Sequence, residues 1–181
     1  MKISVALAAY NGEKYIGEQI ESILPQLGRD DEIVVSDDNP AGKTRAAVEF
    51  YSAYDGRVRY VEGTGEGVCR NFEHCGGDFI FLCDQDDVWL PNKVERVMKA
   101  IENGADVVLH DAMMTDGELN VTDESFFSLN GSKRGFVRNF LKNSYMGCCM
   151  AFRRDFEPAF MPFPKDLAMH EWWIGLNAEL K

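Results

Sequence analysis

Short runs of hydrophobic residues alternate with segments of helical periodicity through the first half of the chain. The runs at 3–8, 32–36, 57–61 and 79–83 predict strands, and those at 32–36 and 79–83 are typical of strands buried on both faces of a parallel sheet. Between the first three, apolar residues at helical spacing predict a helix over 15–24 that Pro25 ends, and another over 43–54. The order strand, helix, strand, helix, strand indicates a parallel sheet with right-handed crossovers.

The pattern is less regular after the strand at 79–83. It predicts a helix over 94–101 that Gly104 ends, a strand over 106–110, and irregular or hairpin structure over 112–133. A short helix over 135–142 and a strand over 146–152 follow, and we expect Arg153 and Arg154 to form the solvated end of that strand. A helix is predicted from 169 to the last residue. We therefore expect an α/β fold, with three α/β/α layers and a mainly parallel central sheet. A length of 181 residues suits one domain with a substantial core.

Composition narrows the class of protein. A hydrophobic fraction of 45% and an aromatic fraction of 12% are typical of a globular chain. The net charge of −11 argues against nucleic acid as a partner, because nucleic-acid binding requires a basic surface. The net charge does not exclude nucleotides as ligands, because a metal ion and a few local cations can neutralise their phosphates. The five cysteines lack metal-ligand spacing, so we interpret them as buried thiols of a reducing cytoplasm.

The N-terminal segment superficially resembles a short signal peptide, because Lys2 precedes an apolar run. Asn11-Gly12 and a helix follow that run directly, and cleavage would remove part of the predicted fold. We therefore expect the first strand of the sheet there. No run in the chain approaches the length of a transmembrane helix.

The strongest chemical signal follows the strand at 79–83. Asp84, Asp86 and Asp87 lie directly after this buried strand, and open α/β sheets bind their ligands at the carboxyl ends of strands. If the segment stays extended, Asp84 and Asp86 share one face, and Mg²⁺ or Mn²⁺ suits a pair of carboxylates. The alternative is an acidic turn without a ligand. We favour that alternative for Asp87 alone, and expect it to cap the next helix.

Carboxylates also follow two other predicted strands, at Asp37-Asp38 and at Asp111. Together with Asp84 and Asp86, these are more acidic residues than the solvation of one sheet edge requires. The glycines of 63–67 resemble the start of a dinucleotide-binding loop, but the third glycine of G-x-G-x-x-G would fall at Val68. We favour a mobile glycine-rich loop at the rim, followed by a short helical turn over 68–74.

Several motifs occur in the order found in the family 2 glycosyltransferases. The segments 83–89, 147–154 and 170–173 read C-D-Q-D-D-V-W, G-C-C-M-A-F-R-R and H-E-W-W. They resemble S-D-Q-D-D-V-W, G-C-x-M-A-F-R-R and H-D-W-W of the bacterial rhamnosyltransferase-like branch. Tyr10-Asn11-Gly12 and Asp37-Asp38 match earlier family motifs, so the resemblance covers almost the whole chain. It implies the GT-A fold and sugar transfer with inversion at the anomeric carbon.

The resemblance implies a nucleotide-binding role for matching residues at the first two strand ends. Ala9, Tyr10 and Asn11 would wrap the base, and Asp38 would accept a hydrogen bond from the ring N–H of uracil or thymine. Asp84 would lie near the ribose. These roles fit the chemistry, because a carboxylate recognises a donor N–H and a tyrosine ring packs on a base.

The resemblance also implies the metal site and the catalytic base. Asp86, with Asp84, would hold the Mn²⁺ or Mg²⁺ that bridges the diphosphate, and Glu171 would be the catalytic base. A metal offsets the charge of the leaving diphosphate, and a carboxylate near the acceptor hydroxyl can take its proton.

The chain departs from the family pattern in four places. The segment 39–42 replaces G-S-T-D, and only three residues separate Phe72 from Gly76, where the family has a longer helix. Glu171 replaces an aspartate, which lengthens the base by one methylene. The chain stops at Lys181, whereas the family continues. We therefore expect a single catalytic domain over 1–181 that lacks the C-terminal part of the family domain.

Other interpretations remain beside these. His170-Glu171 begins like H-E-x-x-H, but Ile174 occupies the fifth position, which argues against a zinc protease. Trp172 and Trp173 are candidates for acceptor binding together with His170, and helix packing explains both tryptophans equally well. A sugar nucleotidyltransferase would need a phosphate loop near the N-terminus, which the segment 11–14 fits poorly. A nucleotide-sugar-binding but inactive remnant is the non-enzymatic alternative.

The implied partners are a nucleotide-diphosphate sugar, with UDP or dTDP as the nucleotide, and a saccharide or lipid-linked acceptor in surface polysaccharide synthesis. We expect a cytoplasmic protein that associates peripherally with the inner face of the membrane.

Overall fold

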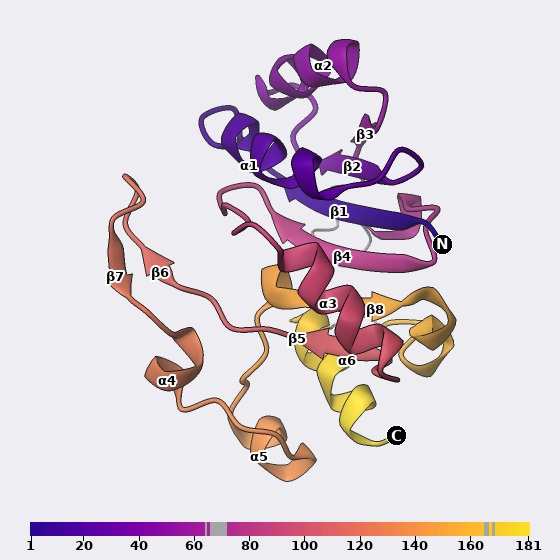
Figure 1. Ribbon diagram of the computed structural model, residues 1–181, viewed down its shortest axis with the longest axis vertical. Helices are drawn as coiled ribbons and strands as arrows, with labels where there is room; N and C mark the ends of the chain where they lie inside the picture. Colours follow the sequence, from indigo (N-terminus) through magenta and orange to yellow (C-terminus); the bar gives the residue numbers. More distant parts are fainter. Residues whose placement is uncertain (64, 66–71, 165–166, 168) are drawn as a thin grey trace.

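A six-stranded sheet forms the centre of the computed structural model, which describes residues 1–63, 65, 72–164, 167 and 169–181 (Figure 1). Its strand order is β3-β2-β1-β4-β8-β5. The strands are β1 (Ile3–Ala9), β2 (Glu32–Asp37), β3 (Val58–Glu62), β4 (Phe79–Asp84), β5 (Val107–Leu109) and β8 (Met150–Arg153). The first four are mutually parallel, and β8 pairs antiparallel with both β4 and β5. The mainly parallel sheet expected from the sequence is confirmed.

Helices cover both faces of the sheet. The main ones are α1 (Ile16–Ile23), α2 (Thr44–Tyr54), α3 (Lys93–Glu102), α6 (His170–Glu179) and the 3-10 helix η4 (Arg154–Ala159). Successive side chains of a strand point to opposite faces. In β1, Val5 and Leu7 join the core cluster beneath α1, α2 and α3, whereas Ala6 joins the cluster beneath η4 and α6. The result is the expected three-layer α/β/α architecture.

A second, two-stranded sheet lies away from the central one. It pairs β6 (Met114–Thr115) with β7 (Val121–Asp123), and the short helices α4 (Phe126–Asn130) and α5 (Phe136–Leu141) follow. In Figure 1 these elements stand to the left of and below the central sheet, on the side to which the carboxyl end of β1 points. The hairpin expected in 112–133 is confirmed, whereas α4 was not predicted.

Two elements differ locally from the prediction. The α-helix α1 ends at Ile23, one residue earlier than predicted, and Pro25 lies in the 3-10 turn η1 (Leu24–Gln26) that follows, near whose start its missing N–H costs little. The predicted strand over 146–152 begins only at Met150. Residues 147–149 form a 3-10 turn, η3 (Gly147–Cys149), which periodicity alone does not distinguish from a buried strand.

The prediction of a solvated strand end is wrong for Arg154. Its guanidinium donates to the carbonyl oxygen of Gly77 at 3.3 Å and to that of Cys75 at 2.5 Å, so it binds η4 to the segment before β4. Arg153 fits the prediction, since its side chain pairs with Asp155 at the surface.

The expected loop at 63–67 and turn at 68–74 lie mostly outside the described residues, as does Cys69. The other four cysteines are free and buried, as predicted. In the part of the chain that the structure describes, no helix is long and apolar enough to cross a membrane.

Candidate active site

The carboxyl ends of β1, β2 and β4 lie side by side at one edge of the sheet. The strand register pairs Ala9 with Asp37, and Ala8 with Asp84. Two of the acidic motifs therefore flank the end of β1, as the strand-end rule predicts.

Residues expected to bind the nucleotide meet in the loops after β1 and β2. The backbone N–H of Asp38 donates to the carbonyl oxygen of Ala9 at 2.9 Å, so the two loops start together. Asn11 has a φ of +52°, which asparagine tolerates better than most residues, and its side-chain oxygen accepts a hydrogen bond from Asn39 at 2.7 Å. Tyr10 is 61% exposed. The structure thus presents a free tyrosine ring beside the Asp38 loop.

The two neighbouring aspartates after β2 have different surroundings. Asp37 is fully buried and accepts hydrogen bonds from the backbone N–H of Asn39 and from the hydroxyl of Tyr60. Burial and the Asp37 carboxylate raise the pKa of Tyr60 to about 12. The Asp38 carboxylate instead accepts from the backbone N–H of Gly65 at 3.2 Å at the surface. Asp37 therefore holds the loop, and Asp38 is the carboxylate available to a ligand.

Gln85 is a site residue that sequence reasoning missed. Its side-chain oxygen accepts from the backbone N–H of Tyr10 at 2.8 Å, and its side-chain nitrogen donates to the carbonyl oxygen of Tyr10 at 3.0 Å. This pair of bonds extends the β1–β4 pairing beyond the strand ends. A side chain at Gly12 would overlap Gln85, because a Cβ there would lie 2.2 Å from the Gln85 side-chain oxygen. Gln85 thus fixes the backbone that carries Tyr10, and only its place inside the D-Q-D motif could have signalled it.

Asp84 lies where several carboxylates converge. Its side chain reaches solvent at the end of β4. Partial burial, followed by repulsion from Asp87, Asp86 and Glu171, raises the pKa of Asp84 to about 6. Glu171 comes from the other end of the chain, so the fold brings it close to Asp84. Four carboxylates therefore share one electrostatic environment.

The geometry after Asp84 corrects two predictions. β4 ends at Asp84 and a turn follows, so the extended segment that was to align Asp84 with Asp86 does not exist. Asp86 lies exposed in this turn. Asp87 does not cap the next helix, since Asn92 occupies the N-cap position of α3. Burial raises the pKa of Asp87 despite the neighbouring Cys148 thiol and Lys93 ammonium group.

A group of potential metal ligands surrounds Asp84. Ligand atoms of Asp84, Asp87 and Cys148 lie within 4.8 Å of one another. The carboxylates suit Mn²⁺ or Mg²⁺, whereas a thiol suits softer ions. The nearby cation, Lys93, is engaged elsewhere: its ammonium group donates to the carbonyl oxygen of Cys148 at 2.9 Å and lies 4.1 Å from the centre of the Trp89 ring. The repulsion between these carboxylates is the feature that a divalent cation would relieve.

Glu171 and His170 lie in the first turn of α6, next to this acidic group. Glu171 is 8% exposed, and its carboxylate lies 3.2 Å from Nδ1 of His170. Burial lowers the pKa of His170 to about 4. Burial also raises the pKa of Glu171, although a backbone N–H at the start of the helix acts in the opposite direction. Desolvation of the Glu171 carboxylate therefore outweighs this hydrogen bond, and the pKa lies above its ordinary value.

Both tryptophans after Glu171 have packing roles. The Trp173 indole N–H donates to the carbonyl oxygen of Phe160 at 2.8 Å, and its ring packs against the core beneath α6. The Trp172 indole N–H donates to the carbonyl oxygen of Asn139 at 2.7 Å, and its ring lies 5.9 Å from that of Phe140. Trp172 therefore connects α6 with α5.

Asp111 follows a strand but holds a helix. Its carboxylate accepts from the hydroxyl of Ser125 at 2.6 Å and from the backbone N–H of Phe127 at 2.8 Å. Burial acts against these hydrogen bonds, but they hold the pKa of Asp111 below its ordinary value. Asp111 therefore stabilises the start of α4.

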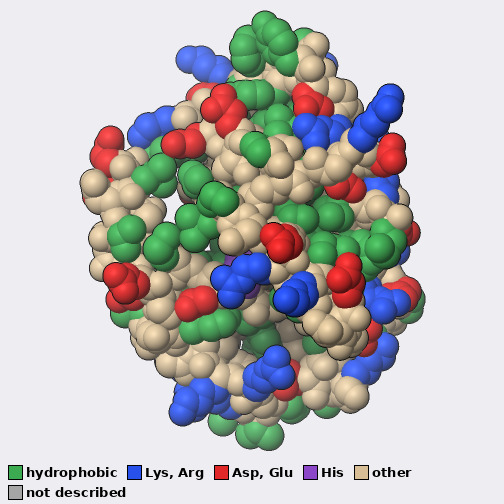
Figure 2. All heavy atoms as spheres, viewed as in Figure 1, with side chains coloured by type: hydrophobic (Ala, Val, Ile, Leu, Met, Phe, Trp, Pro, Cys, Tyr) green, Lys and Arg blue, Asp and Glu red, His purple; other side chains and the backbone are tan. Residues whose placement is uncertain are grey.

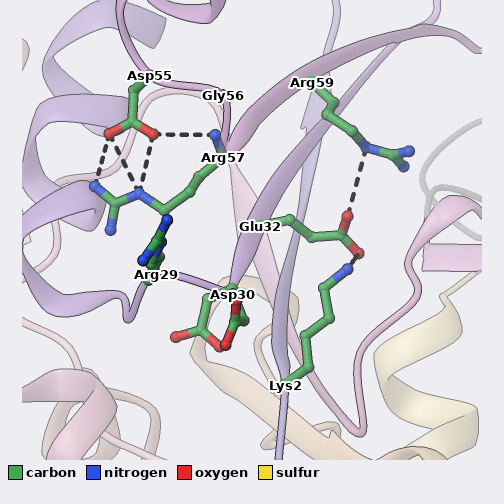
Figure 3. A pocket seen from close by; sticks show the side chains of 9 residues that line it. Lys2, Arg29, Asp30, Glu32, Asp55, Gly56, Arg57 and Arg59 are labelled. Atoms are coloured by element: carbon green, nitrogen blue, oxygen red, sulfur yellow. Dashed lines mark hydrogen bonds and ion pairs between the residues drawn. The ribbon is translucent and has the colours of Figure 1, made fainter.

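A groove of about 700 Å³ lies at the opposite edge of the sheet, where the strands begin (Figure 3). Figure 3 shows Glu32 between Lys2 and Arg59, at 3.0 and 3.5 Å, and Asp55 paired with Arg57 at 2.7 Å. Its charges largely neutralise one another, so we assign this groove to the stability of the sheet rather than to the candidate site.

The fold is thus an α/β fold with a mainly parallel sheet, in which the acidic carboxyl edge is the candidate ligand site. Glycosyl transferase family 2 matches residues 4–158, which is most of the chain. The chain therefore belongs to glycosyl transferase family 2.

Two curated relatives come from bacteria. The dTDP-rhamnosyl transferase RfbG of Shigella flexneri is 25% identical over 188 residues, covering 93% of this chain and 63% of RfbG. WfgD of Escherichia coli, a UDP-Glc:alpha-D-GlcNAc-diphosphoundecaprenol beta-1,3-glucosyltransferase, is 32% identical over 98 residues, covering 51% of this chain and 38% of WfgD. The chain thus spans less than two thirds of either relative. The resemblance to the rhamnosyltransferase-like branch is confirmed by RfbG.

Two solved structures have the same fold. TarS of Staphylococcus aureus, in complex with UDP-GlcNAc, matches with a TM-score of 0.71 at 23% identity, over 99% of this chain and 54% of TarS. The mannosyltransferase PcManGT of Pyrobaculum calidifontis, in complex with GDP-Man and Mn²⁺, matches with a TM-score of 0.68 at 18% identity, over 94% of this chain and 49% of PcManGT. The expected GT-A fold is confirmed.

Proposed function

We propose that this chain is the catalytic core of a metal-dependent, inverting glycosyltransferase that uses a UDP- or dTDP-sugar. The observation that carries the proposal is that Asp84 and His170 line one small cavity at the ends of β1 and β4, and that the Glu171 carboxylate lies 3.2 Å from Nδ1 of His170. A candidate base and a candidate donor site therefore share one sheet edge. The names of RfbG and WfgD, with dTDP and UDP donors, support these nucleotides and a role in surface polysaccharide synthesis.

The nucleotide would lie across the ends of β1 and β2. Ala9 and Asn11 shape the turn, and the exposed Tyr10 ring packs on one face of the base. The Asp38 carboxylate accepts the ring N–H of uracil or thymine. The position of Asp38 beside Ala9 supports this assignment, because their backbones are hydrogen-bonded at 2.9 Å. Asp84, one strand further along, would contact the ribose.

The diphosphate would be held through Mn²⁺ or Mg²⁺ at Asp86 and Asp84. Both are accessible carboxylates, and the Mn²⁺ in the PcManGT complex supports a divalent ion in this fold. When bound, the ion would offset the charge of the leaving diphosphate. Asp87 lies within reach of Asp84, and its contribution is open to test.

Glu171 would act as the base. Its carboxylate takes the proton of the acceptor hydroxyl as the acceptor oxygen bonds to the anomeric carbon. On the opposite side of that carbon, the bond to the diphosphate oxygen breaks and its electron pair leaves with the nucleotide diphosphate, so the configuration inverts. A neutral His170, only 3.2 Å away, would position the carboxylate without neutralising its charge.

The acceptor would approach from the start of α6. His170 faces the ends of β1 and β4 across a small cavity, while Trp172 and Trp173 hold the helix in place. We assign the two tryptophans a positioning role rather than a stacking platform for the sugar. The lipid-linked saccharide named for WfgD supports a similar acceptor class here. Such an acceptor would place the enzyme at the cytoplasmic face of the membrane.

The region 1–181 would form one catalytic domain, and the larger size of RfbG and TarS is consistent with further sequence in the family domain. The test of the reaction is Glu171→Gln, which keeps the shape of the side chain but removes the base. Sugar transfer from labelled UDP- and dTDP-sugars to a lipid-linked saccharide fraction would be measured together with donor affinity. We expect unchanged donor affinity and transfer that is slower by about 10²- to 10⁴-fold.

Glu179→Gln provides a matched control in the same helix. Glu179 accepts from the backbone N–H of Gly135 at 2.9 Å, away from the acidic edge, so transfer should stay at the parent rate. Parent-like transfer by Glu171→Gln would exclude Glu171 as the base. Donor binding without any transfer by the parent chain would instead favour the inactive remnant.

A further inference from the structure

The short helix α5 has its polar and apolar faces reversed. Its buried side chain is polar, since Asn139 is 1% exposed, whereas Val137, Phe140 and Leu141 are 70%, 56% and 79% exposed. Val137 and Leu141 are four residues apart and form one stripe along the helix. A helix of a globular protein normally buries such a stripe. The exposed apolar face of α5 therefore calls for a partner.

Hydrogen bonds fix this orientation. The Asn139 side chain donates to the carbonyl oxygens of Lys133 at 2.9 Å and Gly135 at 3.1 Å. Its own carbonyl accepts from the Trp172 indole at 2.7 Å. Rotation of α5 to bury the apolar stripe would break the bonds to Lys133 and Trp172, which lie outside the helix. The helix is thus held with its apolar face outward.

Basic residues surround the stripe. The segment 131–143 contains Lys133, Arg134, Arg138 and Lys142 and neither aspartate nor glutamate, in a chain with a net charge of −11. All four are exposed. Figure 2 shows basic and hydrophobic side chains together at the lower end of the molecule, where Figure 1 places α5. This local charge is opposite in sign to that of the rest of the protein.

We propose that the α5 face, formed by Val137, Phe140 and Leu141 with the four surrounding cations, docks onto an anionic lipid bilayer. A short apolar stripe framed by lysine and arginine is typical of helices that lie in the membrane interface, where acidic headgroups attract the cations. The charge complementarity selects this partner over an apolar protein surface. The inference rests on the proposed function in one respect, which is that a lipid-linked acceptor would be presented at the same surface.

The position of Trp172 connects docking with the candidate base. The centre of its ring lies 5.9 Å from the centre of the Phe140 ring in the α5 face. In the sequence of α6, Trp172 directly follows Glu171. A bilayer that contacts α5 would therefore lie close to the start of α6. A sugar on a lipid carrier could then reach Glu171 while its lipid stays in the membrane.

Vesicle co-sedimentation of the 181-residue chain tests the proposal. The probes are vesicles of phosphatidylcholine with phosphatidylglycerol, and vesicles of phosphatidylcholine alone. We expect binding to the anionic vesicles that is at least about tenfold tighter and that weakens with added salt. Val137→Glu with Leu141→Glu should reduce this binding by about tenfold or more. Lys133→Gln with Arg134→Gln should have a similar effect through charge alone.

The matched control is Phe50→Glu with Tyr54→Glu on α2. These aromatic residues are 58% and 80% exposed and are also four residues apart, but they lie outside the α5 face. The control should bind anionic vesicles like the parent chain, and circular dichroism should show that every variant folds. Equal loss in the control, or equal binding to both kinds of vesicle, would overturn the proposal.

Two further measurements separate the possible partners and the two proposals. If Val137→Glu with Leu141→Glu dissociates a dimer in the ultracentrifuge and the parent ignores vesicles, a second copy covers α5 and the bilayer proposal fails. Donor affinity is measured in the absence of lipid, so it tests the proposed function alone. If the chain binds vesicles but no donor, the proposed docking surface stands and the proposed donor site is wrong.

Discussion

The Gln85 side chain should control nucleotide affinity although it need not touch the nucleotide. It holds the Tyr10 backbone through two hydrogen bonds, of 2.8 and 3.0 Å. Gln85→Met keeps the approximate length of the side chain and removes both bonds. The loop after β1 should then sample other conformations, so the Tyr10 ring would no longer be preorganised for a base.

The size of the effect follows from the two lost bonds. An intramolecular hydrogen bond contributes about 0.5–1.5 kcal/mol net, and these bonds lie at the surface, where the lower half of that range applies. Their combined loss should cost about 1–2 kcal/mol. If the cost appears in binding, UDP affinity should fall by about 5- to 30-fold. Gly12→Ala should act in the same direction, because the added Cβ would displace Gln85.

Isothermal calorimetry with UDP in Mn²⁺ measures this loss. Gln26→Met is the matched control, since the Gln26 side chain donates to the carbonyl oxygens of Ser22 at 3.0 Å and Leu90 at 3.2 Å and does not contact Tyr10. It should lower stability but leave UDP affinity unchanged. The reasoning is refuted by parent-like UDP affinity in Gln85→Met, or by an equal loss in the control.

Asp38→Ala should weaken UDP binding by about 1.5–3 kcal/mol and leave weak CDP binding unchanged. If calorimetry shows that the parent chain binds CDP and UDP with equal affinity, Asp38 does not recognise the ring N–H of the base. Asp86→Ala should abolish the Mn²⁺-dependent part of UDP affinity without lowering the melting temperature. If Asp87→Ala abolishes it and Asp86→Ala does not, the ion is instead bound by the group of Asp84, Asp87 and Cys148. Hydrogen bonds from Arg57 lower the pKa of Asp55 to about 2. The stability from this pair should therefore be complete above about pH 4 and be lost as the pH falls towards 2. Asp55→Asn should cost about 1 kcal/mol at neutral pH, allowing for partial exposure, and should flatten this acid dependence in denaturant titrations.

The parallel part of the fold could be predicted because its signals are local. Apolar runs identify β1, β2 and β4, and the strand-end rule then brings Asp38 and Asp84 to one edge without knowledge of long-range contacts. The acidic edge itself was therefore accessible from sequence. The distant motif at Glu171 was connected to it only by the family resemblance.

The missed features depend on partners far away in the sequence. Gln85 bonds to the Tyr10 backbone, 75 residues earlier, and no local pattern encodes that contact. Arg154 turns inward because carbonyl oxygens before β4 are available to it. For Trp172 and Trp173, the sequence left sugar binding and helix packing equally open, because a helical pattern does not reveal their backbone acceptors. Tertiary hydrogen bonding, rather than periodicity, decided each case.

The central claim is that the acidic edge binds a nucleotide diphosphate through a divalent metal ion. Its most direct test is calorimetric titration of UDP and dTDP into the chain in Mn²⁺ and in chelator, repeated with Asp84→Asn and with Asp111→Asn as the control from another strand end. We predict that the parent chain and Asp111→Asn bind in Mn²⁺, at least about tenfold more tightly than in chelator, and that Asp84→Asn loses the metal-dependent affinity. Equal affinity with and without Mn²⁺, or parent-like binding by Asp84→Asn, would contradict the claim.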